Sequence, residues 1–194
     1  RERCSRCSRT VLTTHEQFVE EFHRVRRNME AAFAISITVP VIVKMVNAKE
    51  IGRLTGRGFT PTAQPDSRVV GLARKAKDGH EFYIESGSPR TAAITTIAHE
   101  LTHVWQYGNW DEGALATRYG AANLPAVYEG MASWVEIQYL LFVRDFERAQ
   151  REEYYLRNRD DIYGDGFRNF VEKYPLRMDG ETQIDSPFSN AFPL

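Results

Sequence analysis

The sequence predicts one α+β domain with a small, mainly antiparallel sheet and several long helices. Its 194 residues, of which 42% are hydrophobic, are enough for one domain with a core of its own. Apolar residues recur at helical spacing in several segments, and two short apolar runs flank a turn signal. The helices and the sheet are therefore expected to share one core.

The charge balance excludes some classes of partner. Lys and Arg together number 25 and Asp and Glu number 26, so the formal net charge is -1. A chain without excess positive charge has no overall field that attracts nucleic acid or anionic membranes. No apolar run approaches the roughly 20 residues that span a bilayer. We expect a cytoplasmic protein that binds neither nucleic acid nor membrane.

The only cysteines, Cys4 and Cys7, have the spacing of half a zinc site. Two further ligands would come from the N-terminal histidines or from a second pair upstream of the sequence, and we expect the latter. Residues 1–12 are then the remnant of an upstream zinc module or linker, and residues 13–194 form the main domain.

The N-terminal third should contain a helix, a strand and a loop. Thr13 and Glu16 match a capping box, so a helix is predicted from Thr13. Residues 35–46 are rich in Ile and Val and predict a strand, which Pro40 would place at an edge or a bulge. Residues 52–67 contain several Gly and Pro and predict a long surface loop. The apolar stripe of the helix consists of Phe18, Phe22, Val25, Met29 and Phe33.

A β-hairpin is predicted next. Residues 69–76 and 81–86 are strand-like runs on either side of Asp78-Gly79, a pair favoured in tight turns. The second run directly precedes the helix described below. If it lies at the edge of a cleft, its backbone could bind an extended peptide by strand addition.

A helix with recognisable signals at both ends follows. Ser88 is a suitable N-cap, Pro89 suits the first helical position, and Gly108 can close the C-terminus. Beyond it we expect irregular chain at 109–122, helices at 125–150 and 167–174, and an unpatterned tail after Arg177.

Within this helix, His99, Glu100 and His103 form the pattern H-E-x-x-H. Four residues are about one helical turn, so both imidazoles can reach a single metal ion. Glu100 lies about 100° round the helix, where it can reach a water on the metal without being a ligand. The pattern predicts a zinc hydrolase with Glu100 as general base.

A catalytic zinc site needs a third protein ligand and an open fourth position. No histidine follows His103, and position 109 is Asn109, so the third ligand should be a carboxylate. Glu129 is preferred, because it lies one turn into the second long helix and Gly130 beside it permits close helix approach. Glu136, two turns further along nearly the same face, is the alternative.

The oxyanion that forms during hydrolysis should have a hydrogen-bond donor in addition to the metal. Four side chains could supply it, and the sequence alone does not rank them well; we take Tyr163 as the candidate. The four are Tyr163, Arg168, Tyr155 and His80.

Four motifs occur in order: Gly-Ser-Pro-Arg at 87–90, Ile-Ala-His-Glu-Leu-Thr-His at 97–103, Tyr-Glu-Gly at 128–130 and Tyr-Gly-Asp-Gly-Phe-Arg at 163–168. With them the sequence resembles the peptidase domain of the LIM-coupled, ubiquitin-activated "DA-one" family of plant organ-growth regulators. These are gluzincin-type zinc metallopeptidases. The likeness runs over nearly the whole chain.

The resemblance implies a gluzincin-like fold with zinc on His99, His103 and Glu129, and it implies that Glu100 is the general base. It also implies that the cysteine pair belongs to a LIM-like module, which would hold a second, structural zinc in the intact protein. Ubiquitin or that module are then expected partners besides a protein or peptide substrate. The sequence departs from the family in two places. Tyr128 stands where the family usually has an acidic residue, and the region between Gly52 and Gly79 is shorter than in plant members. These departures suggest a prokaryotic homologue acting without ubiquitin.

Together these features predict a zinc-dependent endopeptidase that cuts proteins with a Glu100-activated, zinc-bound water. The alternative is a degenerate, metal-stabilised protein-interaction module that binds without cutting. Glu100 argues against this alternative, because a purely structural zinc site has no use for an unligated carboxylate. A non-peptide hydrolase on the same scaffold is a further alternative.

Overall fold

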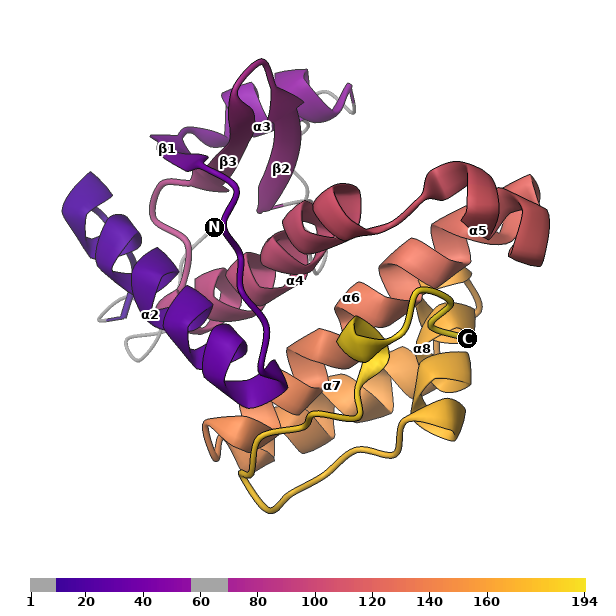
Figure 1. Cartoon of the computed structure of the whole chain (residues 1–194). Helices are drawn as coiled ribbons and strands as arrows, with labels where there is room; N and C mark the ends of the chain where they lie inside the picture. Colours follow the sequence, from indigo (N-terminus) through magenta and orange to yellow (C-terminus); the bar gives the residue numbers. More distant parts are fainter. Residues whose placement is uncertain (1–9, 57–69) are drawn as a thin grey trace. The chain divides into compact units, whose positions relative to one another are not determined.

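The computed structural model describes residues 10–56 and 70–194 (Figure 1). Contacts divide the chain into two compact units. The first contains the described residues up to Val25 together with Val39–Glu100, and the second contains Arg26–Thr38 and Leu101–Leu194. Cys4 and Cys7 lie outside the described residues, so the predicted division at residue 12 stays a prediction.

The first unit contains a three-stranded sheet. β3 (Gly79–Glu85) lies between β1 (Val41–Val46), to which it is parallel, and β2 (Gly71–Ala76), to which it is antiparallel (Figure 1). The α+β class and the β2–β3 hairpin are confirmed, but the sheet is mixed rather than mainly antiparallel. At the hairpin, Gly79 has φ 143°, and a Cβ there would overlap the carbonyl of Pro40.

The strand predicted at 35–46 begins only at Val41. Before it, side chains of helix α2 (His15–Phe33) satisfy the backbone of Ile37. The Glu30 carboxylate accepts its N–H at 3.0 Å, and the Arg26 guanidinium donates to its carbonyl. Because these groups are already bonded, this part of the chain does not pair in a sheet.

The N-terminal helix was predicted correctly, but it begins at His15 instead of Thr13. The Thr14 hydroxyl accepts the N–H of Gln17 at 3.3 Å, and the Gln17 side chain accepts the N–H of Thr14 at 3.2 Å. The capping box is therefore Thr14 with Gln17, one residue later than predicted.

The apolar stripe of α2 forms the core of the first unit where it meets the sheet. The Phe82 ring of β3 lies 5.5 Å from the Phe18 ring and 5.7 Å from the Phe22 ring, measured between centroids. All three side chains are fully or almost fully buried. Aromatic burial of this kind is a large hydrophobic contribution to folding.

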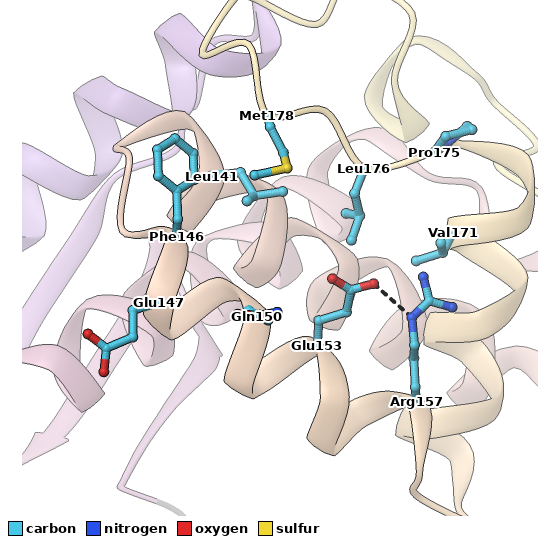
Figure 2. Close-up of a pocket in the computed structure, with 10 residues that line it drawn as sticks. All are labelled: Leu141, Phe146, Glu147, Gln150, Glu153, Arg157, Val171, Pro175, Leu176 and Met178. Atoms are coloured by element: carbon cyan, nitrogen blue, oxygen red, sulfur yellow. Dashed lines mark hydrogen bonds and ion pairs between the residues drawn. The ribbon is translucent and has the colours of Figure 1, made fainter.

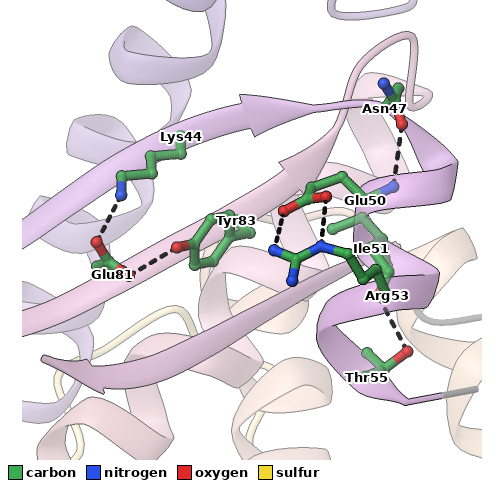
Figure 3. Close-up of polar contacts among 8 residues, drawn as sticks. All are labelled: Lys44, Asn47, Glu50, Ile51, Arg53, Thr55, Glu81 and Tyr83. Carbon is green, nitrogen blue, oxygen red and sulfur yellow. Dashed lines mark hydrogen bonds and ion pairs between the residues drawn. The ribbon is translucent and has the colours of Figure 1, made fainter.

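Part of the loop predicted at 52–67 is helical. Helix α3 (Ala48–Thr55) has Asn47 as its N-cap, whose side chain accepts the N–H of Glu50 at 3.0 Å, and Gly56 at φ 67° ends it (Figure 3). The rest of the predicted loop lies outside the described residues. Favourable capping at both ends explains why this short helix forms.

Polar contacts also link the strands (Figure 3). Lys44 of β1 pairs with Glu81 of β3 at 2.5 Å, and the Tyr83 hydroxyl donates to the same carboxylate at 2.6 Å. The hydrogen bonds from Lys44 and Tyr83 hold the pKa of Glu81 below its usual value. This cross-strand pair supports the parallel β1–β3 register.

The second unit is helical. Helix α5 (Glu112–Tyr119) occupies the stretch predicted to be irregular, and its N-cap Asp111 accepts the N–H of Ala114 at 3.0 Å. The helix predicted at 125–150 is two helices, α6 (Leu124–Phe142) and α7 (Phe146–Arg157). Arg144 has φ 64° between them, a left-handed conformation that interrupts the helix.

The last helix, α8 (Ile162–Lys173), begins five residues earlier than predicted. Asp161 is its N-cap and accepts the N–H groups of Tyr163 and Gly164, at 3.2 and 3.1 Å. Gly164 and Gly166 do not break this helix, because the Asp161 side chain accepts hydrogen bonds from the first backbone N–H groups of the helix.

Two glycines allow α6 and α8 to approach closely, as predicted for Gly130. A Cβ on Gly130 would lie 2.5 Å from the backbone of Gly166, and one on Gly166 would overlap the carbonyl of Ala126. Real Cβ atoms do not come this close to backbone atoms. The helices are therefore in backbone contact beside Glu129.

The tail after Arg177 has no regular apolar pattern in its sequence, and it nevertheless packs against other parts of the second unit. Phe188 in the short 3-10 helix η2 (Pro187–Ser189) lies 4.9 Å from the Phe33 ring and 4.8 Å from the Trp105 ring. The Gln183 N–H donates to the Ala32 carbonyl at 2.7 Å. The ring contacts of Phe188 and the hydrogen bond of Gln183 thus hold a segment whose apolar residues follow neither helical nor strand spacing.

No helix in residues 10–56 and 70–194 combines the length and the apolar character needed to cross a membrane.

The α6–α8 contact gives a stability prediction. We expect Gly166→Ala to lower the free energy of unfolding by about 1–3 kcal/mol, because the new methyl group must force two backbones apart. Gly113→Ala in exposed α5 is the matched control; its Cβ would meet only the Asp111 side chain, at 3.3 Å. This control should be neutral or stabilising by up to about 1 kcal/mol. Urea unfolding of both variants checks the prediction, which is wrong if Gly166→Ala unfolds like the wild type.

Candidate metal centre

Helix α4 (Arg90–Asn109) carries the H-E-x-x-H pattern. The predicted helix is confirmed, but its ends differ: the Ser88 hydroxyl donates to the Glu85 carbonyl at 2.8 Å instead of capping the helix, and Gly108 lies inside the last turn. His99 and His103 are one turn apart and project from one face. The boundary between the two units falls inside α4, so the geometry of this unbroken helix sets His99 relative to His103.

The structure brings Glu129 of α6 to these histidines. Its Oε2 lies 3.5 Å from His103 Nε2. One donor atom from each of His99, His103 and Glu129 lies within 4.8 Å of the other two. His103 is buried, whereas His99 and Glu129 are partly exposed. These three residues could therefore hold a metal ion and leave a side that water or a substrate can reach.

The chemistry of the three donors restricts the type of metal. Two imidazole nitrogens and one carboxylate oxygen suit zinc and other first-row transition metals, whereas calcium and magnesium prefer oxygen ligands. Ligands of tetrahedral zinc are about 3.3 Å apart when each lies about 2.0 Å from the ion. The 3.5 Å between His103 and Glu129 matches this spacing.

The alternative third ligand, Glu136, does not belong to this group. Its charge acts instead on Arg148, a buried guanidinium of α7. Burial lowers the pKa of Arg148, and the charges of Glu152, Asp145 and Glu136 oppose that effect. Glu136 is therefore one of three carboxylates whose charge acts on Arg148, and it is not one of the three metal donors.

Sequence reasoning missed Gln106, which bonds to one of the three donors. Gln106 Oε1 lies 2.7 Å from His103 Nδ1, and Gln106 Nε2 donates to the carbonyl of Tyr128 at 3.1 Å. The available signal was its position three residues after His103, which places both side chains on one side of α4. Its partner on α6 could not be read from spacing.

One aromatic ring stacks on His103, and two more continue from it. The Tyr107 ring lies 6.1 Å from the His103 ring at an interplanar angle of 24°, and Tyr128 lies 6.0 Å from Tyr107 and 4.9 Å from Trp110. Burial raises the pKa of Tyr128. Tyr128, the residue before Glu129, is therefore held among aromatic side chains.

Glu100 contacts the sheet. Its Oε2 accepts the N–H of Ala73 in β2 at 2.7 Å. The predicted peptide-binding strand at 81–86 corresponds to β3, which pairs on both sides and cannot accept an added strand. The condition for strand addition at 81–86 is therefore not met, and among the described residues the edge strand beside Glu100 is β2.

The four oxyanion-donor candidates differ in their surroundings. Tyr163 is half-buried in the first turn of α8, where the Arg159 guanidinium lies 4.6 Å from its ring centroid. Arg168 donates to the carbonyls of Arg157 and Arg159, both at 2.9 Å, and so holds the end of α7. Tyr155 is 53% exposed. These contacts do not rank the candidates, so the role of Tyr163 stays a prediction.

The fourth candidate, His80, is buried in β3. Burial, followed by the nearby charge of Lys75, lowers the pKa of His80. Burial therefore disfavours the charged form of His80. Neither His80 nor Tyr163 belongs to the group of three metal donors.

A pocket of about 520 Å³ in the second unit contains none of the predicted site residues (Figure 2). It lies between α7, α8 and the segment after α8, with the Glu153–Arg157 ion pair of 2.7 Å in its wall. Its apolar lining consists of Leu141, Phe146, Val171, Pro175, Leu176 and Met178. The predicted chemistry and this pocket are therefore formed by different residues.

Comparisons with protein-family models, curated proteins and solved structures found no match to this chain. The resemblance to the "DA-one" peptidases and the gluzincin fold therefore remain predictions.

Proposed function

We propose that this chain is a zinc-dependent endopeptidase of gluzincin type, related to the "DA-one" peptidases. His99, His103 and Glu129 would hold the metal, and Glu100 would move the proton. The observation that carries the proposal is the group of three donors within 4.8 Å, with a carboxylate one residue along the same helix. Two histidines and one glutamate are a ligand set that catalytic zinc sites use.

Zinc held by these residues would act as a Lewis acid on the scissile carbonyl and lower the pKa of a nearby water. The Glu100 carboxylate would accept a proton from the attacking water as its oxygen bonds to the carbonyl carbon. The same carboxylate would then give that proton to the amine nitrogen when the C–N bond breaks. No acyl-enzyme forms on this route.

The bond between Glu100 and Ala73 is compatible with this role. A carboxylate offers about four lone-pair directions, so accepting one N–H at 2.7 Å leaves further acceptor capacity. The bond also fixes the carboxylate against β2. An extended peptide added to that edge strand would lie beside Glu100, and Tyr163 is our candidate donor to the oxyanion.

The competing function is a metal-stabilised interaction module that does not cut. The Glu100–Ala73 bond favours this alternative to a degree, because it gives the carboxylate a structural use as well. The two functions predict the same metal site and differ only in the effect of Glu100 on cleavage. Separate measurements of metal binding and cleavage therefore distinguish them.

Metal binding should depend on Glu129 and not on Glu136. We expect about one zinc per chain at the centre, and Glu129→Gln should weaken its affinity by at least about 10- to 100-fold, since a charged ligand is lost. Glu136→Gln, on the same helix, should bind zinc like the wild type. Competition with a chromophoric chelator, together with elemental analysis, measures both.

The cysteine pair provides a second control. Replacing Cys4 and Cys7 with Ser should leave this zinc in place, because the predicted cysteine site is separate. Loss of the central zinc on that change, or equal zinc affinity of Glu129→Gln and Glu136→Gln, would show that the metal ligands are assigned incorrectly.

Cleavage should depend on Glu100. We expect Glu100→Gln to keep its zinc and to cut an unstructured protein substrate about 10²- to 10⁴-fold more slowly, because the amide cannot accept the proton. The rate of fragment appearance at matched zinc content is the measurement. Equal cleavage by both proteins would exclude Glu100 as the base, and a zinc-loaded wild type that cuts no protein would support the interaction module.

A further inference from the structure

Gln106 is a fully buried polar residue on α4, one turn beyond His103. Its side chain spans from the His103 ring to the backbone of α6. Oε1 lies 2.7 Å from His103 Nδ1, and Nε2 lies 3.1 Å from the carbonyl oxygen of Tyr128. Glu129 directly follows Tyr128 in the chain. The Gln106 amide therefore bonds directly to one of the three donor residues, His103, and to the backbone next to a second, Glu129.

The partners of this amide fix the proton on His103. A backbone carbonyl only accepts hydrogen bonds, so the NH₂ group of Gln106 must face Tyr128 and its oxygen must face the imidazole. An amide oxygen also only accepts, so His103 Nδ1 must donate. A neutral His103 therefore carries its proton on Nδ1 and has its lone pair on Nε2, the nitrogen that lies 3.5 Å from Glu129 Oε2.

We propose that Gln106 is a positioning residue of the metal centre, which holds His103 in the tautomer and orientation that bind metal through Nε2. The inference rests on the metal centre of the proposed function. Without Gln106, the imidazole could carry its proton on Nε2 or rotate about its bond to Cβ, and either change removes the ligand. Partners of this kind orient metal-binding histidines and strengthen metal binding.

The same amide also places α6. By donating to the carbonyl of Tyr128, Gln106 fixes α4 and α6 to each other at the residue next to Glu129. A buried amide with one end unbonded has lost its hydrogen bonds to water without replacement, so the alignment with both bonds is favoured. Gln106 thereby prepares the His103–Glu129 spacing before a metal ion arrives.

Gln138 provides a matched control for a purely structural role. It is 3% exposed and lies on α6, where its Nε2 donates to the Arg177 carbonyl at 2.8 Å and its Oε1 accepts the Arg177 N–H at 2.9 Å. It too is a buried glutamine with two hydrogen bonds to the backbone of another segment. Neither bond involves a metal donor.

The test compares Gln106→Leu with Gln138→Leu in the full chain. We expect zinc affinity, from competition with a chelator, to fall about 10- to 100-fold in Gln106→Leu and to stay unchanged in Gln138→Leu. The visible absorption of the cobalt-substituted protein should change only in Gln106→Leu, because it reports ligand geometry. If the two variants bind zinc equally and give the same cobalt spectrum, the inference is overturned.

A second measurement does not require any variant to fold. Nitrogen-15 NMR of the metal-free wild type, at a pH well above the ordinary histidine pKa, should show His103 protonated on Nδ1. Protonation on Nε2 would overturn the inference by itself. Neither experiment uses protein cleavage, so a chain that fails to cut protein but loses zinc affinity in Gln106→Leu disproves the enzyme proposal and supports the role of Gln106.

Discussion

The candidate function depends on one close approach, that of Glu129 on α6 to His103 on α4. The 3.5 Å between their donor atoms requires α6 to be held with little freedom. Gly130, the residue after Glu129, is in backbone contact with Gly166 of α8, where no side chain fits. Because interiors are packed tightly, a shift of α6 along α8 would open this contact and move the carboxylate. The ligand is therefore positioned by a glycine contact next to it in the chain.

This constraint gives the Tyr-Gly-Asp-Gly-Phe-Arg motif a structural explanation. Gly166 meets α6, and a Cβ on Gly164 would overlap the carbonyl of Arg159. Arg168 donates to that same carbonyl and so joins α8 to the end of α7. Three of the six residues thus fix α8, and α8 in turn fixes the helix that carries Glu129. The motif supports the metal centre through packing, whatever Tyr163 contributes to chemistry.

Local signals predicted many of the elements. The differences come in part from local caps that the prediction missed, at Asn47, Asp111 and Asp161, and in part from contacts between separate elements. The β2–β3 hairpin and the α4 helix with both histidines followed from turn residues and spacing. The parallel partner of β3 did not, because nothing local specifies β1 as a neighbour. Strand pairing does not extend before Val41 because Glu30 and Arg26 of α2 bond the backbone of Ile37, and the helix break at Arg144 coincides with its left-handed backbone. In the site, spacing relates Gln106 to His103, three residues before it, but it does not show the second partner of Gln106, which lies 22 residues away.

The glycine contact between α6 and α8 has little directionality, and the hydrogen bonds of the buried side chains of Gln106 and Gln138 are directional. Backbone contact between helices sets how closely they approach and opposes a large shift, but it opposes a small shift less strongly, since van der Waals contact has little direction. A buried amide with two backbone partners is directional, and each bond is lost if the helix moves by even part of a turn. Gln138 fixes α6 to the segment after α8 in this way, and Gln106 fixes it to α4. The glycine contact and the two bonds of Gln106 together hold Glu129 beside His103, as metal coordination requires, whereas the bonds of Gln138 hold a part of α6 that carries no metal donor.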